Sequence, residues 1–259
     1  MGVVTSLPAW LLVVVSLVLS LIIACGARVL VRAVVPEAEY DSVQGIAAPL
    51  MAALGAVFAV MMALTLAGEA GYLRTAQDLV SEEAEAASRL AWAATSPGVG
   101  SQPIHAALLD YLQVTRANEW RDLSADGDPD TEQAISSLER VVRAEAARDE
   151  IGTPASTELL TSLDAVTSGR RARTAAASRE IPVLYVVTLI AAGVALIANA
   201  ASLAFRTSLR TLSPVMGLAV VVGLSIALLF ALSAPWRGPL IVSGQPLDAV
   251  VRDLQNGLF

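Results

Sequence analysis

Lysine is absent from this 259-residue chain, histidine and cysteine occur once each, and only 16% of the residues are charged. The single cysteine, Cys25, excludes an intrachain disulfide and a zinc site built from paired cysteines. The single histidine, His105, excludes any site that needs two histidines from one chain. No glycine-rich phosphate loop with its lysine occurs either. We therefore expect no catalytic site, no metal centre and no cofactor.

Apolar residues are in excess instead, at 55% of the chain. They gather in four stretches without charge, at residues 7–27, 46–67, 181–205 and 212–234. Each stretch is close to the roughly 20 residues that a helix needs to cross a bilayer core. A soluble core helix seldom stays uncharged for so long, so the sequence predicts an all-α integral membrane protein with four transmembrane helices.

Four polar side chains lie inside these stretches: Thr65, Thr188, Asn199 and Ser225. We expect each to bond a neighbouring helix or its own preceding turn, because lipid offers no other partner.

The rest of the chain gives the domain organisation. Residues 1–67 hold the first two spans, residues 68–180 form a helical extramembrane domain, residues 181–234 hold the last two spans, and residues 235–259 form an irregular tail.

Four helices are predicted within the extramembrane domain. The second span continues as a helix through residues 69–94, which hold no proline. A second helix begins at Pro103 and reaches about Leu123, a third is capped by Asp130, and a fourth opens at Pro154.

Arginine placement indicates the orientation. Two connections carry Arg28, Arg32, Arg206 and Arg210. The opposite side carries Arg74, Arg170, Arg171, Arg173, Arg179 and Arg237. The excess favours a cytoplasmic N terminus, central domain and C terminus, in a bacterial inner membrane. The opposite topology stays open, because long domains cross largely regardless of charge.

Two local patterns are weak matches to known signals. Residues 22–25 resemble a lipoprotein cleavage site, but no basic residue precedes Cys25. The segment 122–133 has the oxygen ligands and the glycine, Gly127, of a calcium loop, but Gln133 stands where a bidentate glutamate belongs. We interpret this segment as an acidic turn, with calcium binding as the open alternative.

Three stretches carry a resemblance to a known family: VSEEAEAASRL at residues 80–90, YLQVTRANEW at 111–120 and APWRGPLIVS at 234–243. With two spans before a helical insert and two after it, the chain resembles the bestrophin-like transmembrane domain family of unknown function. True bestrophins are pentameric ion channels whose second helix lines the pore and forms a hydrophobic neck. The resemblance thus implies a channel, although no neck motif matches residue by residue.

A candidate pore face follows from that resemblance. On the second span, Leu50, Leu54, Phe58 and Met62 recur every four residues and form one stripe. In a ring of copies, the stripe would give apolar collars that gate by excluding water. Ordinary helix packing is the alternative use of the same stripe.

Selectivity would then depend on charges at the expected cytoplasmic mouth. Its candidate carboxylates are Glu69, Asp78, Glu82, Glu83 and Glu85. They outnumber Arg74 and Arg89 in the same stretch, so cations would be favoured.

Membrane lipid and further copies of the chain are the expected partners, and nucleic acid is not. A broad alanine surface follows the second span, comprising Ala84, Ala86, Ala87, Ala91, Ala93 and Ala94. We predict that this surface joins copies in a homo-oligomer. The alternative function is an accessory protein that binds lipid or a larger membrane complex without transport.

Overall fold

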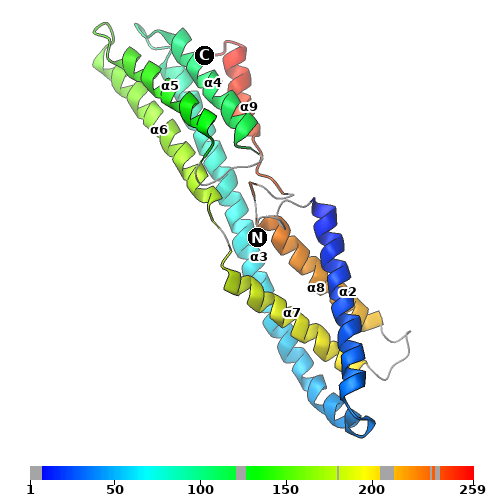
Figure 1. Cartoon of the computed structure of the whole chain (residues 1–259). Coiled ribbons are helices and arrows are strands. Elements are labelled where there is room, and N and C mark those ends of the chain that lie inside the picture. The colour runs from blue at the N-terminus through cyan, green and yellow to red at the C-terminus, as the bar shows by residue number, and fades with distance from the viewer. Residues whose placement is uncertain (1–7, 121–126, 180, 205–212, 234, 237–239) are drawn as a thin grey trace. The chain divides into compact units, whose positions relative to one another are not determined.

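The structure is a computed structural model, and it describes residues 8–120, 127–179, 181–204, 213–233, 235–236 and 240–259. Every regular element among these residues is a helix (Figure 1). Four helices are long and apolar enough to cross a membrane. The predicted all-α chain with four spans is therefore confirmed.

The helices form two compact units. The membrane unit comprises residues 1–71, 180–234 and 238–240, and the extramembrane unit comprises residues 72–179, 235–237 and 241–259. One helix, α3 (Tyr40–Ala93), contributes to both units.

The membrane unit consists of α2 (Ala9–Val34), the short 3-10 helix η1 (Glu37–Glu39), the first part of α3, α7 (Val183–Leu203) and α8 (Ser213–Leu232). The first helix is longer than the uncharged stretch predicted, because it continues through Arg28 and Arg32. Apolar residues between and after these arginines maintain the helical pattern.

Two glycines let the membrane helices approach closely. A Cβ at Gly193 of α7 would lie 3.0 Å from Val222 Cγ1 on α8 and 3.3 Å from Phe58 Cε2 on α3. A Cβ at Gly223 of α8 would lie 3.0 Å from the Ser16 carbonyl oxygen and 3.2 Å from Leu17 Cα, both on α2. Small residues serve this purpose in lipid, where dispersion rather than the hydrophobic effect holds helices together.

The polar groups within the spans bond as predicted. Asn199 Nδ2 of α7 donates to the Ala47 carbonyl of α3 at 2.9 Å, which joins two helices. The hydroxyls of Thr65, Thr188 and Ser225 each donate to the carbonyl four residues earlier.

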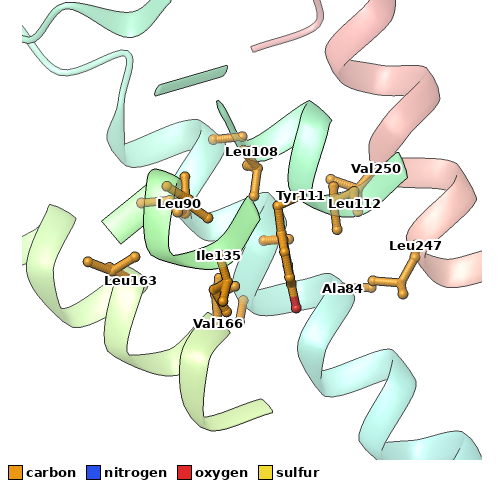
Figure 2. Close-up of a cluster of buried hydrophobic side chains, with 14 of the residues drawn as sticks. Ala84, Leu90, Leu108, Tyr111, Leu112, Ile135, Leu163, Val166, Leu247 and Val250 are labelled. Atoms are coloured by element: carbon orange, nitrogen blue, oxygen red, sulfur yellow. The ribbon is translucent and has the colours of Figure 1, made fainter. Parts of the chain in front are cut away.

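The extramembrane unit packs four helices around an apolar core. They are the second part of α3, α4 (Ser101–Asn118), α5 (Pro129–Ala146) and α6 (Thr153–Ala177). Figure 2 shows Leu90, Leu108, Ile135 and Leu163 converging from these four helices. The predicted helices therefore exist, with different ends.

The ends differ chiefly in two places, and α4 also begins at Ser101 rather than at Pro103. Asp128, not Asp130, caps α5: its carboxylate accepts from the Thr131 backbone N–H at 2.9 Å, and Pro129 occupies the first turn. The second helix of the domain, α4, ends at Asn118 rather than near Leu123.

The C-terminal tail, which the sequence predicts to be irregular, contains a helix. Residues Gln245–Gln255 form the helix α9. Pro246 suits its first turn, and Leu247 and Val250 are buried against the core of the extramembrane unit. The prolines before this segment hide the three-residue spacing that predicts an amphipathic helix.

The alanine surface does not remain available to another copy. All six alanines are buried within the extramembrane unit. Ala87 is 0% exposed, so the prediction that this surface joins copies is wrong. Helices of the same chain cover it.

The tight contact between α2 and α8 gives a stability prediction. We expect Gly223→Leu to lower the thermal unfolding temperature of the protein in detergent, because the side chain would collide with α2 backbone. Overpacking of this kind costs about 1–3 kcal/mol. Gly217→Leu on the same helix is the control, since nothing lies within 4 Å of a Cβ at Gly217. Equal unfolding temperatures for the two variants would contradict the predicted contact.

Candidate functional site

Charged side chains meet inside the extramembrane unit. Glu83 of α3 and Arg173 of α6 are both fully buried. Arg173 Nε donates to Glu83 Oε2 at 2.6 Å, and Arg173 Nη2 lies 2.8 Å from Glu119 Oε2. Buried charges are tolerated in proteins when they are paired and hydrogen-bonded.

A second arginine extends this arrangement to α5. Arg170 Nη2 donates to Glu119 Oε1 at 2.9 Å, and Arg170 Nη1 donates to Glu132 Oε2 at 2.5 Å. We call Glu83, Glu119, Glu132, Arg170 and Arg173 the ion-pair network. It connects α3, the end of α4, α5 and α6 through side chains.

The sequence of α6 explains how the network forms. A Cβ at Gly169 would lie only 3.2 Å from Glu83 Cα, so glycine lets α6 approach α3 at this level. Arg173 follows one turn later and therefore reaches the Glu83 carboxylate. Arg170 lies three residues before Arg173, on a similar face of the helix.

Tyr111 of α4 completes the environment of Glu83. Its hydroxyl donates to Glu83 Oε1. Burial raises the pKa of the Tyr111 phenol well above its ordinary value, and the nearby Glu83 carboxylate raises the pKa further. The phenol therefore stays protonated and serves as a donor.

The charge of Arg173 is stabilised by its partners. Burial on its own would lower the pKa of Arg173, but the attraction of Glu83 and Glu119 outweighs burial and leaves the pKa above its ordinary value. The guanidinium thus stays charged, and the network acts as a fixed electrostatic contact rather than as a proton donor.

Aromatic rings cover one side of the network. Arg173 Cζ lies 5.6 Å from the Trp120 ring centroid, and Arg116 Cζ lies 4.5 Å from it. Trp120 meets Trp236 edge to face, with centroids 6.2 Å apart. Trp120 Nε1 also donates to the Val242 carbonyl at 3.0 Å, which ties the C-terminal segment to the network.

Two further contacts hold the C-terminal segment. Arg116 of α4 binds Asp248 of α9 through two hydrogen bonds, of 2.6 and 2.9 Å. The Gln77 amide exchanges hydrogen bonds with the Ser243 backbone, accepting at 2.9 Å and donating at 3.2 Å. Together these contacts fix α9 beside α3 and α4.

The four candidate pore residues do not share one environment. Phe58 and Met62 are buried in the packed core of the membrane unit, whereas Leu50 is exposed and Leu54 is half-buried. Two members of the stripe therefore serve helix packing, the alternative considered for the sequence. A pore lined by the whole stripe would have to displace Phe58 from its contact with Gly193.

The candidate mouth carboxylates also divide into two groups. Asp78, Glu82 and Glu85 are exposed on α3. Glu69 and Glu83 are buried, and Glu83 is paired with Arg173 rather than free to attract ions. Of the five carboxylates expected at an acidic mouth, only Asp78, Glu82 and Glu85 are therefore exposed.

The calcium-loop pattern falls partly outside the described residues, to which Asp122, Ser124 and Asp126 do not belong. Asp128 is described, and its carboxylate caps α5. Among the described residues, no group of three or more potential ligand side chains could hold a metal ion.

The fold and the network define a class: a multi-pass α-helical membrane protein with an ion-paired helical domain between its second and third spans. Within that class, the chain belongs to the Bestrophin-like domain family, whose model matches residues 18–247. The suspected family is thereby confirmed. Searches of the curated proteins and of the solved structures gave no match.

The ion-pair network gives a second stability prediction. We expect Arg173→Leu to destabilise the extramembrane unit by about 3–5 kcal/mol, because it leaves the buried carboxylate of Glu83 without its charged partner. Arg171→Leu, next to it but exposed, is the control. Chemical denaturation followed by tryptophan fluorescence would measure the difference. Equal loss in both variants would mean that the buried pair is not the cause.

Proposed function

We propose that the chain is a subunit of an oligomeric, non-enzymatic ion channel in a bacterial plasma membrane. The observation that carries the proposal is the uncovered membrane part of α3. Only 11% of its most apolar stretch is buried within the chain, against 17% for α2 and 33% for α7 and for α8. Membership of the Bestrophin-like domain family supports the proposal.

The uncovered face of α3 differs from the stripe expected first. It exposes Val57, Val60 and Leu64, which follow one another at helical spacing. Val60 is 59% exposed and Leu64 is 71% exposed. Repeated around a ring, these side chains would form the apolar constriction, while Phe58 and Met62 hold α3 against the other spans.

Cation preference is the second part of the proposal. Asp78, Glu82 and Glu85 are exposed along α3 beyond the membrane part. Several copies of this group would create a negative potential that concentrates cations, and salt would screen it over about 8–10 Å.

Conductance tests the channel. In planar bilayers, Val60→Asn should raise conductance, because a polar side chain keeps an apolar constriction hydrated. Val221→Asn is the matched control, since Val221 is also exposed, at 58%, but lies on α8. Phe58→Ala should leave selectivity unchanged, because Phe58 is buried.

The reversal potential under a potassium chloride gradient separates the alternatives. A cation-selective current that weakens in Glu82→Gln/Glu85→Gln supports the acidic mouth. A preference for anions would overturn the proposal that exposed carboxylates attract cations, but it would leave the proposal of a channel intact. No current from correctly assembled protein would overturn the channel and favour the accessory role.

Orientation has its own test. The arginine excess favours a cytoplasmic extramembrane unit, so we expect a reporter that is active only in the cytoplasm to work when inserted at Gly98. Gly98 is exposed in the turn after α3 and has a positive φ of 86°, which makes it suited to insertion. Activity of a periplasmic reporter at the same site, and not of the cytoplasmic one, would reverse the topology.

A further inference from the structure

The outer face of α5 is basic. Its buried stripe is formed by Thr131, Ala134, Ile135, Leu138 and Val142. The opposite face exposes Gln133, Ser136, Arg140, Arg143, Ala144 and Ala147. This face holds two arginines, and the half-exposed Glu139 lies at its edge, four residues before Arg143. Neither arginine forms an ion pair with another described residue of its own chain.

The outer face of α3 presents an exposed aromatic ring. Trp92 is 65% exposed, which is unusual for so large an apolar side chain outside a membrane. Glu158 of α6 lines the groove beside Arg89 of α3 and is exposed as well. The indole face can bind an arginine, and the Glu158 carboxylate farther along the unit can pair with a second one. Arg89, one turn before Trp92, is a cation on the same face.

The two faces point in opposite directions. The buried stripes of α3 and α5 both contribute to one core. The helices α4 and α6 lie between α3 and α5. They contact α3 through Tyr111 and Arg173, and both pack against α5. A face opposite each stripe therefore points outward on its own side of the unit. Surfaces that match each other from opposite sides of one subunit can join copies head to tail.

The ion-pair network allows heights along the bundle to be compared. With about 1.5 Å per helical residue, Trp92 lies about 13.5 Å beyond Glu83. Arg173 lies at the height of Glu83, and Arg170 lies about 4.5 Å beyond it. Because Arg170 binds Glu132 of α5, Glu132 lies at that same height. Counting along α5 from Glu132 then puts Arg140 about 16.5 Å and Arg143 about 21 Å beyond Glu83. Glu158, fifteen residues before Arg173 on the antiparallel α6, lies at about 22.5 Å.

Arg140 thus shares the height of Trp92, and Arg143 shares the height of Glu158. We propose that the α5 face of one copy docks on the α3 face of the next, with Arg140 over the Trp92 ring and Arg143 paired with Glu158. Rotation about an axis parallel to the bundle preserves these heights, so the contact builds a ring. The inference rests on the oligomeric part of the proposed function and supplies its interface.

Disulfide cross-linking of the full-length protein in mild detergent tests the contact. The background is Cys25→Ser, which removes the only native thiol. In it, Trp92→Cys/Arg140→Cys should form a ladder of dimers, trimers and larger species on oxidation. Trp92→Cys alone and Arg140→Cys alone should remain monomeric on a denaturing gel, because head-to-tail contacts do not place like positions together.

The control pair is Asp110→Cys/Arg140→Cys, since Asp110 is exposed on α4 and belongs to neither face. A ladder equal to that of the Trp92 pair would overturn the proposal, as would dimers of Trp92→Cys alone, which indicate a two-fold contact. Charge exchange gives a second measure: Arg143→Glu should disperse the assembly, and added Glu158→Arg should restore it. Native mass spectrometry separates the two ideas, because a ring without the ladder refutes only the interface, whereas a monomer refutes the oligomer.

Discussion

The contact between Glu83 and Arg173 is the constraint on which the extramembrane unit depends. It joins the helix that continues from the second span to the helix that precedes the third, at the level where Gly169 brings their backbones together. A slip of α6 by one turn, about 5.4 Å, would move Arg173 among apolar side chains without a partner. The cost of a buried unpaired charge therefore fixes the register of α6 on α3.

The positions of the other residues of the ion-pair network follow from the register of α6 on α3. Once Arg173 faces Glu83, its second side reaches Glu119, which ends α4, and Arg170 reaches Glu119 and Glu132. Trp120 follows Glu119 and bonds Val242, so the C-terminal segment is positioned as well. A chain of local contacts thus carries the arrangement from α3 to α9.

Periodicity in the sequence was sufficient for the helices but not for the charges. The four spans and the helices of the domain follow from uncharged length and from apolar spacing. Glu83 looked exposed because it stands in an acidic run. Yet it lies three residues after Val80 and four before Ala87, on the predicted apolar stripe. Its partner Arg173 lies seven residues after Val166 and continues the apolar stripe of α6 in the same way. Two opposite charges on two apolar stripes are the signal that predicts a buried pair.

What covers an apolar face is harder to infer, because periodicity identifies the face and not its partner. The alanine surface of α3 is covered by helices of the same chain, one of which, α9, follows a proline-rich segment that hides it. Phe58 and Val60 lie two residues apart on α3, and only packing against Gly193 decides which of them faces inward. One helix thus has its side chains fixed by an ion pair outside the membrane and by a glycine contact within it. The faces that neither contact uses, around Val60 and around Trp92, are exposed in the described part of the chain.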